Sequence, residues 1–440
     1  MPGEADDYRF VMGSSLNWPP IASPTRTGLN APTSSTGAAL WTLEGLRGVD
    51  PVLGLALLTV LAVVLADWLH RHARLPRACG HMLVGALASP LVLALLPRTK
   101  LDGWKPLIDL AIAVLVFELG TRIRPRWLID NPALAVTSVL EGLLAGAAVM
   151  ASLMLMGVPL LSAAVAGSVA MSTSPVVTLA VLHESRPRGQ VTERLLLMTA
   201  INSVLAMLLL KVWHVVAASA AADAATATAG GLYVVAGSFL LGAACGLLLE
   251  LLSRRLRGTS AMPVLQIGLV TIASLLAVQW TLSPLLALLA AGVVARSRMR
   301  HGLTVEPQLG SAGAALGVVL FVCLGLLLTL DRLLDLWPWV GAIIAARAVG
   351  KGIGVALLAR PSGLGWRQAL ALTIALQPMS SLAVLLAADT FAWASQLPGM
   401  DQAALQALLI ATSLMQLTGP LWTTIALRSA AREADGESTR

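Results

Sequence analysis

Residues 166–182 read AGSVAMSTSPVVTLAVL, an apolar run of membrane-spanning length that is interrupted near its middle by STSP, residues 172–175. A second run, residues 371–387, reads ALTIALQPMSSLAVLLA and is interrupted in the same way by QPMSS, residues 377–381. Proline removes a backbone donor and clashes with the preceding helical turn. Backbone groups freed at membrane depth are tolerated only beside protein or a water-filled cavity. The two interruptions therefore predict discontinuous membrane helices.

The composition of the whole chain agrees with a membrane protein. The 440 residues are 57% hydrophobic and only 12% charged, with a mean hydropathy of +0.80. Soluble proteins carry about 25% charged residues, so the chain is neither an ordinary soluble enzyme nor a disordered protein. Long continuous apolar runs and an aromatic content of 4% favour a helical bundle over a β-barrel. The predicted class is an all-α polytopic membrane protein.

Thirteen apolar runs of about spanning length follow one another along the chain. Residues 1–48, before the first run, are polar and rich in Ser, Thr, Pro and Gly, and lack the features of a signal peptide, so we expect a disordered tail there. The predicted spans are 51–70, 78–97, 106–121, 133–157, 159–182, 192–216, 230–253, 261–280, 284–296, 310–330, 336–359, 367–392 and 401–428.

Arginine marks alternate loops between these runs. One set of loops holds two or three arginines each, whereas the opposite set holds only Arg98, Lys100, Lys105 and Arg332. The positive-inside rule then places the N-terminus outside and the tail 429–440 in the cytoplasm, which requires an odd number of spans. We expect a multi-pass protein of the inner (plasma) membrane. Because the net charge of +7 comes from these short loops, no nucleic-acid partner is expected.

Three charged residues fall deep inside predicted spans. Arg347 lies near the middle of the eleventh span, Lys351 one turn further on the same face, and Glu141 inside the fourth. A charge at that depth costs at least ~2.5–3.5 kcal/mol unless it is paired or hydrated. Two interpretations remain open. Glu141 and Arg347 form a structural ion pair, or Glu141 carries protons while Arg347 and Lys351 compensate charge in a transport site.

Other titratable residues suggest no further chemistry. The three cysteines are far apart and the six histidines are scattered, so neither a metal site nor a cofactor is expected. Glu118 lies one turn before Arg122 at the end of the third span, which predicts a local ion pair. Lys211, near the end of the sixth span, is expected to reach the membrane interface.

The positions of the interruptions suggest an internal repeat. If spans 1–6 and 8–13 are two repeats joined by the linker span 230–253, both interruptions fall in the fifth span and the repeats are inverted. Broken helices at matching places in inverted repeats indicate the substrate site of a transporter. The deep polar residues then define a core unit, 133–216 and 336–428, which would move against a scaffold unit, 51–121 and 261–330.

With these features the chain resembles the monovalent cation:proton antiporter superfamily, the sodium/proton exchanger fold, over about residues 51–428. The resemblance rests on VLVFELGTRIRPRWL (114–128), MSTSPVVTLAVLHESRPRGQVTERLLLMTAINSVLAMLL (171–209) and IIAARAVGKGIGVALLAR (343–360). It implies an elevator-type antiporter, generally a homodimer, that exchanges Na+, K+ or Li+ for protons.

The resemblance also implies where the ion site lies. In the family a carboxylate on the sixth span binds cation and proton alternately, and the corresponding pair of positions falls on Asn202 and Ser203. Ser203 cannot titrate, which departs from the family pattern. The Arg-Gly that many members carry in the second interrupted helix is replaced by PMS, residues 378–380. The basic residue of the eleventh span matches Arg347, or less well Lys351.

Three functions remain open at this point. In the first, the chain exchanges a monovalent cation for protons with Glu141 as the titrating acid. In the second, the fold carries a small anion or organic acid; in the third, it is a non-transporting regulatory protein. No acid/base or metal set suited to an enzyme is visible at depth. The neutral site residues expected for the exchanger are Thr173, Ser174, Asn202, Ser203, Gln377 and Ser380.

Overall fold

The computed structural model describes residues 51–89, 104–123, 130–187, 189–219, 224–255, 261–298, 306–328, 330, 332–379 and 400–437, and within them the chain is helical with no β-strand. The helices are α2 (Pro51–Ala73), α3 (Arg77–Ala88), α4 (Lys105–Arg122), α6 (Pro132–Leu155), α7 (Leu160–Ala170), α8 (Pro175–Ser185), α9 (Gln190–Ser219), α10 (Ala224–Arg255), α11 (Met262–Gln279), α12 (Pro284–Arg298), α13 (Glu306–Leu326), α14 (Leu333–Leu357), α15 (Trp366–Ala375) and α17 (Gln402–Glu437).

Local sequence signals set many of these boundaries. Helices α4, α6, α8 and α11 each carry proline at the first or second position, where its missing N–H removes no helical hydrogen bond. Helix α6 is followed by Gly157 with φ of 86°, and the Val158 and Gly157 amides bond back to Leu153 and Met154. This left-handed glycine turn ends α6 and redirects the chain.

Every one of the thirteen predicted spans contains a helix, which confirms the all-α membrane class. Eight segments of the described chain are long and apolar enough to cross a membrane. The other predicted spans correspond to α3, α4, α12, α13 and α15, which are shorter, less apolar or border residues that are not described. The tail 1–48, residues 380–392 and the Lys211 side chain lie outside the described part. Helix α17 continues to Glu437, beyond its predicted end at 428.

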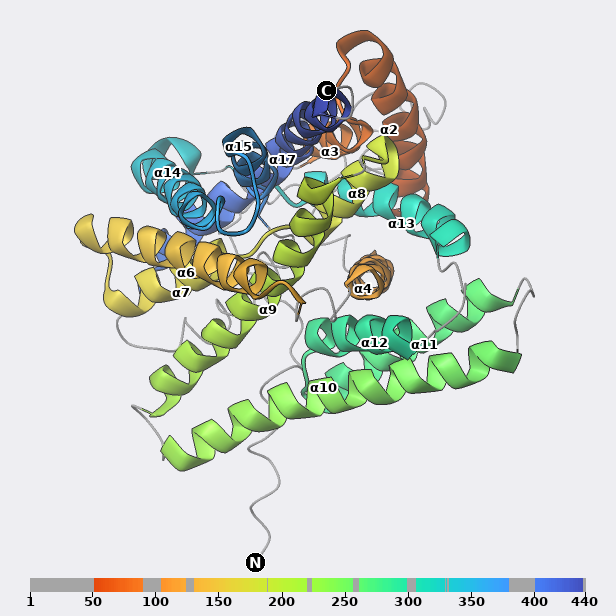
Figure 1. Ribbon diagram of the computed structural model, residues 1–440, viewed down its shortest axis with the longest axis horizontal. Helices are drawn as coiled ribbons and strands as arrows, with labels where there is room; N and C mark the ends of the chain where they lie inside the picture. The colour runs from red at the N-terminus through yellow and green to blue at the C-terminus, as the bar shows by residue number, and fades with distance from the viewer. Residues whose placement is uncertain are drawn as a thin grey trace, which may run out of the picture.

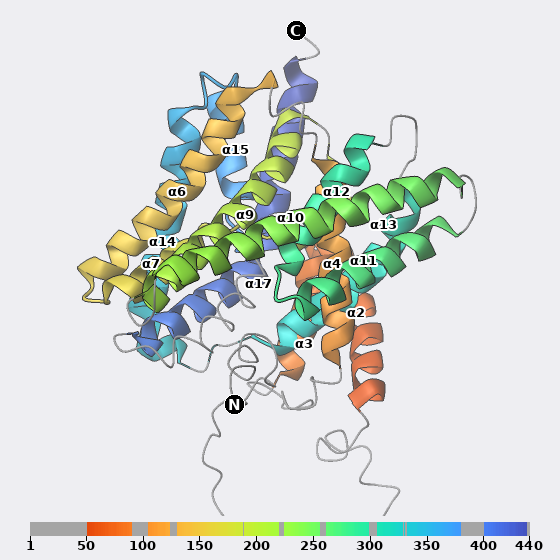
Figure 2. The same ribbon diagram turned by 90° about the horizontal axis from the view of Figure 1, so that it is seen from below.

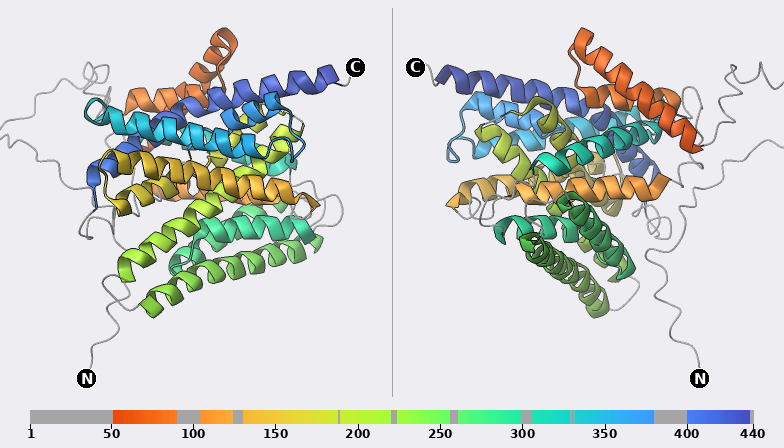
Figure 3. Two further views of the ribbon diagram at one scale, coloured as in Figure 1. Left: turned by 60° about the vertical axis from the view of Figure 1, so that its left-hand side comes forward. Right: turned by 90° about the vertical axis from the view of Figure 1, so that its right-hand side faces the viewer.

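The helices gather on two sides of the molecule. Figure 1 shows α6, α7, α14, α15 and α17 together on one side, α10, α11 and α12 on the opposite side, and α4 end-on between them. Figure 3 shows α9 running between the two sides and α10 along the lower edge, and in Figure 2, seen from below, α10 crosses the front of the molecule. Buried apolar residues form one large cluster around α4, α8, α9 and α12 and another around α6, α7, α14 and α17. Whether the two sides move against each other stays a prediction.

Helix packing has the two-fold relationship expected of inverted repeats. Helix α3 (span 2) packs on α13 (span 10), and α4 (span 3) packs on α12 (span 9). The repeat relates span 2 to span 9 and span 3 to span 10, so these two contacts are equivalent. Contacts of α8 with α17 and of α15 with α9 are equivalent in the same way, and α6 packs on α14, its own counterpart.

Glycines place this relationship at individual residues. A Cβ atom at Gly85 would overlap the Val322 carbonyl oxygen on α13, and one at Gly292 would overlap the Phe117 carbonyl oxygen on α4. In each case the oxygen lies three residues before the facing glycine, which is Gly325 in the first pair and Gly120 in the second. The two helix crossings therefore share one register, and both need a residue without a side chain.

We expect Gly292→Ala to lower the thermal stability of the protein markedly. The added Cβ would meet backbone on α4, including Gly120 Cα at 2.8 Å, so the two helices would have to separate. Gly268→Ala on α11 is the matched control, because nothing lies within 4 Å of its Cβ position. Alanine in a helix is favoured over glycine by about 1 kcal/mol. The melting temperature of purified protein in detergent should fall for Gly292→Ala and stay level or rise for Gly268→Ala. Equal changes in the two variants would contradict the close crossing of α4 and α12.

Candidate functional site

Non-helical backbone lies at both interruptions that the sequence predicted, and these two stretches contact each other. Helix α7 ends at Ala170 and α8 begins at Pro175, while α15 ends at Ala375 and is followed by non-helical residues 376–379. The amide of Ser174 donates a hydrogen bond to the Pro378 carbonyl at 2.9 Å. Two stretches of unwound backbone thus lie side by side inside the protein.

Arg347 of α14 holds both breaks together. Its side chain is fully buried, and its Nε and Nη2 donate to the carbonyls of Ala170 (2.6 Å) and Ser172 (2.9 Å) at the first break. Its Nη2 also donates to the carbonyl of Leu376 (3.1 Å), and its Nη1 donates to both the carbonyl (2.5 Å) and the side-chain oxygen (3.2 Å) of Gln377. The guanidinium therefore satisfies carbonyls left without helical partners at the C-terminal ends of α7 and α15.

Glu141 pairs with Lys351 and not with Arg347. One carboxylate oxygen of Glu141 accepts from the Lys351 ammonium, and both side chains have no exposed surface. The Lys351 ammonium also donates to the Met171 carbonyl (3.3 Å) and to Thr173 Oγ1 (3.2 Å) at the break. Gly354 lets α14 approach this closely, because a Cβ there would lie 2.9 Å from Glu141 Cβ. Glu141 thus forms a buried ion pair, but its partner is Lys351 and not Arg347, the residue considered from the sequence.

Asn202 brings α9 to the same carboxylate. Its Nδ2 donates to the second oxygen of Glu141 at 2.8 Å and lies 3.3 Å from Thr173 Oγ1. Its Oδ1 is buried and has no hydrogen-bond partner among the described residues. Glu141, Lys351, Asn202 and Thr173 therefore form one polar cluster, which leaves a free oxygen acceptor next to the carboxylate.

The other predicted site residues lie around this cluster or outside the described part of the chain. Ser203 Oγ donates to the carbonyls of Thr173 (3.2 Å) and Thr199 (2.9 Å), so it touches the cluster only through backbone. Ser174 caps α8, since its hydroxyl accepts from the Val177 amide at 3.2 Å. Gln377 supports Arg347. Ser380 is not among the described residues.

The cluster can bind a cation through oxygen. Carboxylate, hydroxyl, amide and main-chain oxygens are the ligands that hard cations prefer. In the conformation described here the Lys351 ammonium occupies the cation position beside Glu141. A metal ion must therefore displace it or bind while Lys351 is deprotonated. Among the described residues no group of three or more His, Cys, Asp or Glu could hold a resident metal ion.

A profile for the family "Sodium/hydrogen exchanger, transmembrane" matches residues 57–428, most of the chain. The chain belongs to the sodium/hydrogen exchanger family. Solved structures of one exchanger share its fold. The sodium proton antiporter MjNhaP1 from Methanocaldococcus jannaschii, at pH 8, is 15% identical with a TM-score of 0.67, covering 86% of this chain and 98% of the other. An electron-microscopy structure of MjNhaP1 is 16% identical with a TM-score of 0.65, and the match covers 86% of this chain and 96% of the other. No curated protein sequence matches this exchanger-family chain significantly.

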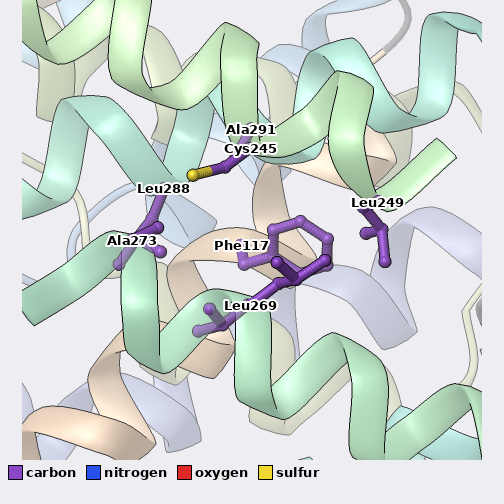
Figure 4. A pocket seen from close by; sticks show the side chains of 8 residues that line it. Phe117, Cys245, Leu249, Leu269, Ala273, Leu288 and Ala291 are labelled. Carbon is purple, nitrogen blue, oxygen red and sulfur yellow. The ribbon is translucent and has the colours of Figure 1, made fainter. Parts of the chain in front are cut away.

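A small pocket, lined mostly by buried side chains, lies away from this cluster. It is lined by side chains from α4, α10, α11 and α12, among them Phe117, Cys245 and Leu269 (Figure 4). Because its lining carries no charged group and no oxygen or nitrogen in a side chain, it offers a cation nothing beyond an apolar wall. The polar cluster at the two breaks is the better candidate site.

Proposed function

We propose that the protein exchanges a monovalent cation, Na+ or K+, for protons, and that Glu141 carries the exchange. The supporting observation is the position of Glu141: a fully buried carboxylate whose oxygens are shared by Lys351 and Asn202, both of which also contact Thr173 at the first helix break. Such a carboxylate binds a cation when ionised and releases it when a proton takes its place.

The proposed site assigns roles to the surrounding residues. Asn202, Thr173 and Ser203 would supply neutral oxygens, with Ser174, Gln377 and Ser380 at its margin. Lys351 would balance the charge of Glu141 when no metal ion is bound, so that the pair stays neutral overall. Arg347 would place its positive charge at the carbonyl ends of α7 and α15 and keep those carbonyls hydrogen-bonded throughout the cycle, since main-chain carbonyls do not titrate.

Transport of an anion is less well supported by this geometry. A guanidinium has five N–H donors, and Arg347 makes five hydrogen bonds to protein oxygens. No donor is left for a substrate anion. Lys351 is engaged by a carboxylate. The second interpretation from the sequence therefore lacks its anion-binding residue in this conformation.

The movement we propose is of the elevator type. Helices α6, α7, α8, α9, α14, α15 and α17 would carry the site across the membrane against α2, α3, α4, α11, α12 and α13, with α10 as the link. Large apolar side chains exposed on α2 and α10, such as Leu57, Val64, Leu240 and Leu251, suit lipid or a second copy in a homodimer. The N-terminus would lie outside and the C-terminus in the cytoplasm of the plasma membrane.

The experiment that tests the proposal uses purified protein in liposomes with an imposed pH gradient. Addition of Na+ or K+ should dissipate the gradient faster than in protein-free liposomes, because each cation that crosses exchanges for protons. Li+ and the impermeant cation choline complete the series. A folded protein that gives no cation-dependent dissipation would contradict antiport and favour a regulatory role or a different solute.

A further inference from the structure

The C-terminal end of α8 is attached to three helices of the predicted scaffold unit, α2, α3 and α4. Its last residues include His183 and Glu184, and their side chains bond to residues of α2, α3 and α4. Helix α8 begins at the first break, next to Thr173 and Ser174 of the candidate site. These contacts therefore join the helix that carries the site to helices that would stay still during transport.

Glu184 caps helix α3. Its two carboxylate oxygens lie 3.2 and 3.1 Å from the amide nitrogen of Arg77, the first residue of α3. The residue before it, Pro76, offers no side-chain cap, so the carboxylate from α8 takes that place. At the end of α2, the Nδ1 atom of His70 lies 3.0 Å from Glu184 Oε1. The same nitrogen lies 2.9 Å from the carbonyl oxygen of Leu75.

His183 binds the other neighbour, α4. Its Nε2 lies 2.7 Å from Glu118 Oε1, and the same oxygen accepts from Arg122 Nη2 at 2.7 Å, which is the local ion pair predicted from the sequence. Only 6% of the Glu118 side chain is exposed. Water screens this cluster less than an ion pair on the surface, so its contribution to binding between the helices is larger.

We propose that His183 and Glu184 form a single electrostatic latch, the α8 latch, which holds the site-bearing helices against α2, α3 and α4 in the conformation described here. Because His183 and Glu184 are neighbours on one helix and bind different helices, α4 in one case and α2 and α3 in the other, losing either contact loosens the other. The role in transport rests on the proposed elevator movement, in which α8 has to leave these partners. The latch itself is a property of the fold.

The test uses the amide of Arg77 as a reporter. Its hydrogen bond is to the Glu184 carboxylate, so its hydrogen exchange measures how often that contact opens. His183→Ala removes the α4 contact and leaves the side chain of Glu184, the next residue, and its bond to the Arg77 amide unaltered in chemistry. If the two contacts are one latch, the variant should speed exchange at Arg77 about tenfold, as expected for the loss of one charged hydrogen bond. Unchanged exchange at Arg77 would overturn the proposal.

Two further variants complete the experiment. Glu118→Ala weakens the same contact from the α4 side and should also speed exchange at Arg77, which covers the case that His183→Ala does not fold. Glu250→Ala is the matched control, because Glu250 pairs with Arg254 inside α10 and should leave Arg77 unchanged. The measurement needs no transport, so it decides on the latch whether or not the chain exchanges cations.

Discussion

Arg347→Ala is expected to destabilise the protein strongly, by about 3–5 kcal/mol, the range measured when one partner of a buried charge interaction is removed. The substitution leaves the carbonyls of Ala170, Ser172, Leu376 and Gln377 buried without their donor. Each unsatisfied group carries a desolvation penalty of about 1–3 kcal/mol. Part of this is offset because the buried guanidinium no longer has to be desolvated.

The measurement is the melting temperature of purified variants in detergent. Arg347→Lys keeps the charge but has three donors instead of five, so its melting temperature should fall between those of the wild type and Arg347→Ala. Arg332→Ala serves as the control: Arg332 is half exposed, and its contacts are to the Gln406 side chain and to Asp335. Such surface pairs contribute about 0–1 kcal/mol. Similar melting of Arg347→Ala and Arg332→Ala would show that the breaks do not depend on the guanidinium.

The sequence predicted the helical architecture and both interruptions because these depend on local chemistry. Long apolar runs predict membrane-spanning helices. Proline alone does not decide a break, since Pro338 and Pro420 lie inside continuous helices, but both interruptions combine proline with several polar residues. The non-helical residues 171–174 and 376–379 overlap the interruptions predicted at 172–175 and 377–381, and residues 380 and 381 lie outside the described part. Matching positions of the interruptions in the two repeats also indicated where the candidate site lies.

The partners of the buried charges were not predictable in the same way. The ion pair considered from the sequence joined Glu141 to Arg347, whereas the partner is Lys351, one turn further on, because one sequence does not fix the rotation of a helix. The choice depends on main-chain carbonyls at the breaks, which have no signature in the sequence. Gly354 was a usable signal: a small residue facing Glu141, one turn beyond Lys351 towards the end of α14, marks a close approach of α6 and α14.

Glu141→Gln is expected to abolish cation-dependent proton movement, reducing it to the level of protein-free liposomes. The glutamine amide has nearly the shape of the glutamate carboxylate, but it does not ionise and so cannot take up and release a proton. Glu250→Gln is the matched control, since Glu250 is also paired but lies on α10 away from the breaks. Cation-dependent dissipation that survives in Glu141→Gln would show that another group carries the proton.

A second variant separates loss of transport from loss of folding. Glu141→Gln leaves the Lys351 ammonium buried without its counter-ion, which is expected to destabilise the fold by several kcal/mol, of the order of ~3–5. Adding Lys351→Met removes that charge, so the double variant should regain much of the melting temperature and still not transport. Lys351→Met alone leaves the Glu141 carboxylate without a cation. Because a metal ion can then take that place without competition, Na+ or K+ should raise the melting temperature of this variant more than that of the wild type. Equal shifts would mean that the cation does not bind where the ammonium lies.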